Sequence, residues 1–117
     1  MKLRPLALLV ALVLGLAAVG GAAAKTSKEH STSVMVVAKD FSFTLTPKTA
    51  PHGSVAFTIK NEGKTSHDFS IDGHTSKTIG PGKTTQLTVE LKAGHWPYKC
   101  TVDSHAKLGM KGVLKVT

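Results

Sequence analysis

The chain has 117 residues, of which 41% are hydrophobic, and its 15 basic and 7 acidic residues give a formal charge of +8. This length allows one core and therefore one domain. The single cysteine, Cys100, excludes an internal disulfide. The lysines are spread along the chain and Arg4 is the only arginine. Proteins that read nucleic acids use clustered, arginine-rich surfaces, so no nucleic-acid partner is expected.

Residues 1–24 have the three parts of a secretory signal peptide. Lys2 and Arg4 form a charged start, an apolar run follows, and three alanines ending at Ala24 supply a cleavage site. We expect cleavage after Ala24 and export to the periplasm or out of the cell. The apolar run is also close to bilayer-spanning length. An uncleaved anchor is therefore the alternative, and only then would the chain contact a membrane.

The polar residues 25–33 are expected to form a flexible N-terminus, and residues 34–117 the folded domain. In this domain, apolar side chains alternate with polar ones in short runs between Gly-, Pro- and Asn-containing turns. These runs cover residues 34–38, 41–45, 55–59, 67–71, 87–91, 96–102 and 112–117. No helical periodicity is seen after residue 24. Seven or eight short strands of this spacing predict an all-β domain, an antiparallel β-sandwich.

The stretch between the last two strands carries the most informative residues. Cys100 is followed after four residues by His105, and His105 after four more by Met110. A thiolate, an imidazole and a thioether favour copper over calcium, magnesium or manganese. Electron-transferring copper sites use one Cys, two His and often a weak axial Met. Taken singly, a buried Cys or Met can equally be core packing.

A second histidine would have to come from another part of the chain. His67 begins an apolar alternating run, so its ring is expected to face the core with Phe69 and Ile71. The other histidines lie in polar segments or turns, or have the opposite parity to Cys100: His30, His52, His74 and His95. A lone inward-facing histidine is more often a hydrogen-bonded core residue than a ligand. His67 by itself leaves both interpretations open.

Together these residues resemble those of the cupredoxins, the small blue-copper proteins that include plastocyanin, pseudoazurin, azurin and rusticyanin. The similarity extends from about residue 34 to residue 117. Two segments carry it, namely Asn61-Glu62-Gly63-x3-His67-Asp68-Phe69 and Tyr98-x-Cys100-x4-His105-x4-Met110-x-Gly112. A Cys-His-Met hairpin with a single upstream His is far more specific than any of its parts.

The resemblance implies a Greek-key β-sandwich with one mononuclear type 1 copper ion near one end. His67 and His105 would bind copper through ring nitrogens, Cys100 as the thiolate, and Met110 as the long axial ligand. The implied function is that of a monomeric one-electron carrier between redox proteins, not an enzyme. His105, on an exposed loop, would give electrons a short route to the surface.

The chain departs from the family pattern at two places. Plastocyanin and pseudoazurin have two residues between the Cys and His ligands, where this chain has four, a spacing nearer to that of rusticyanin and the phytocyanins. Asp68 stands where plastocyanin has Asn. In the family the main-chain N–H at this position donates to the thiolate, and an Asp can still do so. Whether its side chain also joins the two ligand loops is left open.

A docking surface is expected around Leu108 and Gly109, with Lys99, Lys107 and Lys111 near its rim. Such a surface suits an acidic redox partner, for example a cytochrome or a reductase. A copper storage or delivery protein is the main alternative function. A structural zinc site and a metal-free sandwich used for adhesion are further alternatives.

Overall fold

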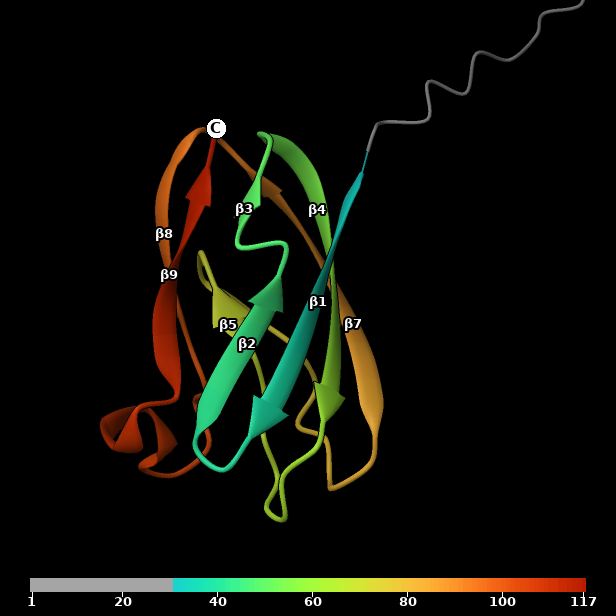
Figure 1. Ribbon diagram of the computed structural model, residues 1–117, viewed down its shortest axis with the longest axis vertical. Coiled ribbons are helices and arrows are strands. Elements are labelled where there is room, and N and C mark those ends of the chain that lie inside the picture. Colours follow the sequence, from blue (N-terminus) through green and yellow to red (C-terminus); the bar gives the residue numbers. More distant parts are fainter. Residues whose placement is uncertain (1–30) are drawn as a thin grey trace, which may run out of the picture.

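The computed structural model describes residues 31–117, so the expected signal peptide and most of the expected flexible N-terminus lie outside it. The described part contains nine strands and one short 3₁₀ turn, η1 (Figure 1). The strands are β1 (Thr32–Lys39), β2 (Ser42–Thr46), β3 (Thr49–Ala50), β4 (Gly53–Asn61), β5 (Ser70–Ile71), β6 (His74–Thr75), β7 (Thr84–Leu91), β8 (Gly94–Lys99) and β9 (Lys111–Val116), and η1 is His105–Leu108. No helix in residues 31–117 is long and apolar enough to cross a membrane.

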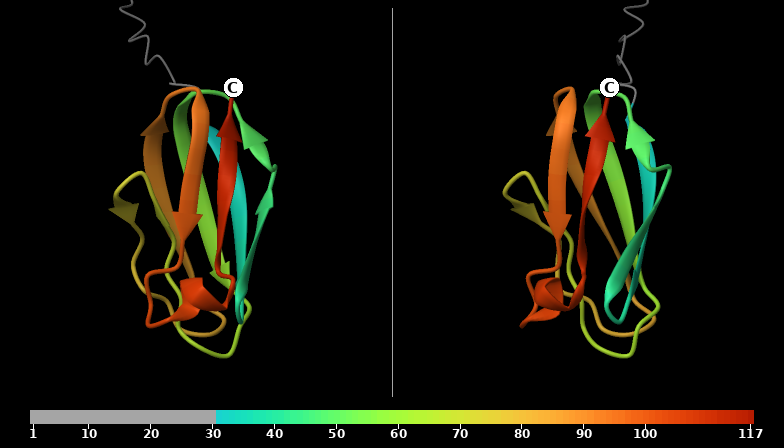
Figure 2. Two further views of the ribbon diagram at one scale, coloured as in Figure 1. Left: turned by 90° about the vertical axis from the view of Figure 1, so that its left-hand side faces the viewer. Right: turned by 60° about the vertical axis from the view of Figure 1, so that its left-hand side comes forward.

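The strands form two sheets that pack face to face as a sandwich (Figures 1 and 2). One sheet has the order β2-β1-β4-β7, and the other has the order β3-β9-β8-β5-β6. The predicted all-β sandwich is thus confirmed. The sheets are mixed rather than wholly antiparallel, because β1 pairs with β4 and β3 pairs with β9 in parallel. Alternation specifies which face of a strand is buried but not the direction of its neighbour.

The strand number and bounds differ from the expectation in small ways. Nine strands are found instead of seven or eight, because the structure adds two strands of only two residues each, β3 and β6. β1 begins at Thr32, two residues before the expected start of the domain. β8 ends at Lys99, so Cys100 lies just beyond the strand that was expected to continue to Val102.

The core between the sheets consists of the inward-facing side chains of these alternating strands. In β4, Val55, Phe57 and Ile59 are fully buried, while the residues between them are partly exposed. Phe69 lies at the centre of an aromatic group and its ring centroid is 5.0 Å from that of Phe57. A second, smaller apolar cluster of Ala38, Cys100 and Met110 lies apart from the main core.

Three connections come together at one end of the sandwich. These are the β1–β2 turn, the β4–β5 connection that carries His67, and the β8–β9 connection that contains η1. In every view the β1–β2 turn and η1 lie at the end opposite to the C terminus (Figures 1 and 2). Residues that are distant in the sequence therefore meet at this end.

Candidate metal centre

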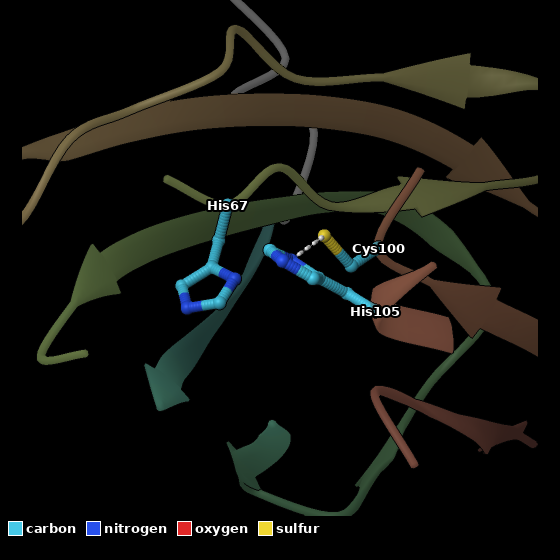
Figure 3. Close-up of side chains that lie close together, drawn as sticks. All are labelled: His67, Cys100 and His105. Atoms are coloured by element: carbon cyan, nitrogen blue, oxygen red, sulfur yellow. Dashed lines mark hydrogen bonds between the residues drawn. The ribbon is translucent and has the colours of Figure 1, made fainter. Parts of the chain in front are cut away.

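The side chains of His67, Cys100 and His105 converge at this end of the sandwich (Figure 3). One ligand atom from each residue lies within 4.8 Å of the other two, and all three residues are buried. Nδ1 of His105 is 3.7 Å from Sγ of Cys100. The ring centroids of His67 and His105 are 5.0 Å apart.

His67 is positioned by the loop that precedes it. Its main chain forms an isolated antiparallel bridge with Ile79, with N–H···O distances of 3.0 and 2.8 Å. The buried Asn61 side chain organises the loop, because its amide nitrogen donates to the carbonyl oxygens of Thr65 and Ile79 at 2.8 and 2.9 Å. Its oxygen accepts from the Gly63 N–H at 2.8 Å. These bonds close the loop tightly and aim His67 inward.

The His67 ring has one nitrogen bonded and one nitrogen free. Nε2 is 2.6 Å from a carboxylate oxygen of Asp40, which lies in the β1–β2 turn. A carboxylate only accepts hydrogen bonds, so Nε2 carries the proton and donates it. Nδ1 is fully buried and has no hydrogen-bond partner within residues 31–117. A buried polar atom without a partner is unusual and calls for an explanation, and a metal ion would be a suitable partner.

Asp40 remains a carboxylate over a wide pH range. The main-chain N–H of Lys64 donates to it at 2.8 Å, and the Thr65 hydroxyl donates at 2.9 Å. The bond from Lys64, with the contacts to His67 and Thr65, lowers the pKa of Asp40 from 3.8 to about 2, against the opposing effect of burial.

Cys100 lies at the start of the β8–β9 connection, where the main chain holds the thiol inward. Its N–H donates to the carbonyl oxygen of Met110 at 3.0 Å, and the Met110 N–H donates to that of His105 at 3.2 Å. Burial raises the pKa of the thiol. The main-chain N–H groups of Asp68 and Val102 act in the opposite direction and lower it.

The Asp68 side chain joins the two ligand segments. Asp68 is only 4% exposed. One carboxylate oxygen accepts from the Thr101 N–H at 2.6 Å, and the other accepts from the Thr101 hydroxyl. The residue after His67 is thus bonded to the residue after Cys100. The question that the sequence left open is answered, because Asp68 connects the two segments.

His105 lies nearest to the surface of the three. It is the first residue of η1 and is 7% exposed, whereas His67 and Cys100 are 0% and 1% exposed. Its loop is exposed as expected, but most of the ring is covered. Phe41, from the β1–β2 turn, packs against it with ring centroids 4.7 Å apart.

Of the expected site residues, His67, Cys100 and His105 come together, and Met110 lies fully buried in the same apolar cluster as Cys100. His52, His74 and His95 are exposed, and His30 lies outside the described residues. Asp40 and Phe41 were not predicted as site residues, because an Asp at the end of a strand-like run is typical of any turn.

The three residues suit copper. A thiolate and two imidazoles form the strongly bound part of a trigonal copper site, and Met110 is the type of residue that completes it. The unpartnered Nδ1 of His67, buried beside the thiol, provides a free lone pair for a metal.

The sequence and the fold were compared with known proteins. The family model of the cupredoxin-like domain matches residues 6–116. No curated protein matches the sequence. Solved structures with a similar fold include a dithionite-reduced auracyanin from the photosynthetic bacterium Roseiflexus castenholzii (TM-score 0.65, 20% identity, covering 74% of this chain and 98% of that chain).

Two further auracyanins are similar to the same degree. Auracyanin A, described as a "blue" copper protein from the green thermophilic photosynthetic bacterium Chloroflexus aurantiacus, has a TM-score of 0.65 and 20% identity, and covers 74% of this chain and 99% of that chain. Auracyanin B has a TM-score of 0.65 and 19% identity, and the similarity covers 74% of this chain and 88% of that chain. At this level of identity the similarity shows the fold.

The raised pKa of Cys100 predicts that metal binding releases a proton. The free thiol is protonated at pH 8, whereas a metal binds the thiolate, so copper(II) uptake should release about one proton per ion. Below the thiol pKa, the apparent affinity should rise about tenfold per pH unit. Titration with copper(II) in weakly buffered solution, with Cys100→Ser as the control, measures this release. Uptake by the unchanged protein without proton release would contradict the prediction.

Proposed function

Because the chain belongs to the cupredoxin-like family, we propose that it binds one copper ion at the His67–Cys100–His105 cluster and carries single electrons between redox proteins. The observation that supports this proposal best is the convergence of two histidines and the only cysteine, all buried, within 4.8 Å. The unpartnered Nδ1 of His67 points to the same conclusion.

In this proposal Nδ1 of His67, Sγ of Cys100 and Nδ1 of His105 would hold the metal, with Met110 as the fourth ligand. Bound copper supplies a one-electron couple. The chain keeps the ligands nearly fixed between the two oxidation states, since Asp40 and Asn61 hold the His67 segment and Asp68 bonds it to the Cys100 segment. Fixed ligands reduce the rearrangement that accompanies each electron transfer.

A carrier is favoured over an enzyme by the number of ligands. Catalytic metal sites keep one coordination position open for water or substrate. A site that uses His67, Cys100, His105 and Met110 leaves no such position. The covering of His105 by Phe41 also keeps water away from the cluster.

An absorption spectrum tests the copper site directly. Copper(II) added to the protein should give an intense orange-red absorption band from the Cys100 thiolate, bleached by ascorbate and restored by an oxidant. Cys100→Ser should abolish the band while the circular dichroism spectrum keeps its β form. Copper uptake without the band would favour the storage or delivery alternative, and an intensely blue Cys100→Ser protein would exclude this assignment.

The partner is proposed to be an acidic redox protein, such as a cytochrome or a reductase, that docks over η1. Leu108 is 61% exposed there, and Lys107 and Gly109 beside it are exposed. Lys99 and Lys111 are cross-strand partners at the base of the same connection. An apolar centre with a basic rim would steer an acidic surface toward His105.

Oxidation of the reduced protein by the anionic hexacyanoferrate(III) tests this electrostatic steering. The rate should fall as salt is added, because salt screens the attraction between the lysines and the anion. Lys107→Glu should slow the reaction at low salt, on the order of several-fold. Lys92→Glu makes the same charge change next to the β7–β8 turn and should have a much smaller effect. Equal effects of the two variants would contradict a localised surface.

Export is proposed from residues 1–24 alone. A mature protein with the mass of a chain that starts at Lys25, found outside the cytoplasm by intact-mass measurement, would support cleavage after Ala24. A membrane-bound chain with its full mass would instead support the anchor alternative.

A further inference from the structure

We propose that Asp40 is a positioning residue for the metal centre, which holds the His67 ring with Nδ1 directed at the cluster and lowers the reduction potential of bound copper. This inference rests on the proposed copper function for its second part only. The orientation of the ring is a property of the chain without metal.

The contact between Asp40 and His67 joins two distant parts of the chain. Asp40 lies between β1 and β2, 27 residues before His67, and its Oδ1 is 2.6 Å from Nε2. His67 is fully buried and the Asp40 side chain is 23% exposed, so the bond lies at the edge of the buried cluster. Among the residues that the structure describes, the only other neighbour of Nε2 at hydrogen-bond distance is the Thr65 hydroxyl, at 3.4 Å.

The bond determines which nitrogen can bind a metal. A neutral imidazole has one N–H and one lone pair. Since Nε2 keeps its proton and donates a hydrogen bond to the carboxylate, the lone pair is on Nδ1, which is the buried atom without a partner among the described residues. A ring with the opposite tautomer would place a lone pair against a carboxylate and a proton inside the cluster. Asp40 therefore selects the tautomer that can bind metal, as carboxylates do for histidine ligands in other metal proteins.

The carboxylate is itself held in place. Its other oxygen accepts the Lys64 N–H at 2.8 Å, and the Thr65 hydroxyl donates to the same oxygen that contacts His67. The close approach of the Asp40 carboxylate to the His67 ring depends on Gly63. A Cβ at this position would lie 2.3 Å from Oδ1 of Asp40 and 2.9 Å from Nε2 of His67. Only a residue without a side chain leaves room for the bond.

The sign of the effect on the potential follows from charge. Cu(II) has one more positive charge than Cu(I), so a nearby carboxylate stabilises the oxidised state more. The hydrogen bond also makes the imidazole more basic, so that its Nδ1 donates its lone pair to the metal more strongly, which again favours Cu(II). Both effects lower the reduction potential. A residue that only fastened the loop would affect stability without changing the potential in a fixed direction.

Asp40→Asn separates these possibilities, because the amide oxygen can still accept the hydrogen bond from Nε2 but carries no charge; the NH₂ group replaces only the oxygen that accepts the Lys64 N–H. We expect the Cu(II)/Cu(I) equilibrium to shift toward Cu(I) on the order of tenfold, which is about 59 mV higher in potential for one electron. Glu62→Gln is the matched control, since Glu62 makes only a surface ion pair with Lys60 at 3.6 Å. An unchanged or lower potential in Asp40→Asn, or an equal rise in Glu62→Gln, would overturn the electrostatic part.

Nuclear magnetic resonance of the metal-free and Cu(I) forms tests the orientation of the ring without any variant. Long-range ¹H–¹⁵N correlation should place the His67 proton on Nε2 in both forms, with slow exchange against solvent. A proton on Nδ1 in the metal-free protein would overturn the positioning role. This result does not depend on colour, so a failure of the copper function and a failure of the inference are distinguishable.

A pair of glycine substitutions provides an independent test in which Asp40 is unchanged. Gly63→Ala must push the carboxylate away from His67, and so should raise the potential and speed exchange of the Nε2 proton. Gly80→Ala is the control, because a Cβ there meets nothing within 4 Å and Gly80 does not have a positive φ. If Gly63→Ala folds and leaves both quantities as in Gly80→Ala, the role given to the Asp40 contact is wrong.

Discussion

Asp68 accepts two hydrogen bonds from Thr101 and in this way bonds the residue after His67 to the residue after Cys100. The two ligand segments belong to connections that approach each other only at the end of the sandwich. Packing of the two sheets brings these connections near each other, but it does not by itself fix their relative position. A buried carboxylate with both oxygens bonded to one residue does so, because either segment could shift only by leaving a buried charge unpaired.

The centre is thus supported from two directions by acidic side chains in a basic protein. Asp68 acts between the ligand segments, and Asp40 reaches in from the β1–β2 turn to the outer nitrogen of His67. The packing of the two sheets sets the distance between the connections, and the connections carry the ligand residues. The two carboxylates then restrict the movement of the ligand segments. Together these contacts hold His67, Cys100 and the segments that carry them in place.

The sequence was sufficient for the sandwich and for the three converging residues, because burial follows alternation in β1 and β4 and because ligand chemistry depends on residue type. It was not sufficient for strand direction. A strand buries the same face whether its neighbour is parallel or antiparallel, so the parallel pairing of β1 with β4 could not be predicted. Asp68 is buried next to a buried His67, which strict alternation does not allow. Asp40 was missed for a different reason. Its role depends on a turn and a loop 27 residues apart meeting in space.

The position of the chain ends has a practical consequence. β1 starts at Thr32, and β9 ends at Val116, at the end of the sandwich opposite to η1 (Figure 1). A protein attached to an electrode or to a fusion partner through its C terminus would therefore present Leu108 and the edge of His105 to the solution. Immobilisation through a residue near Leu108 would turn this face toward the support. The two attachments give a simple way to expose or hide the metal end of one and the same molecule.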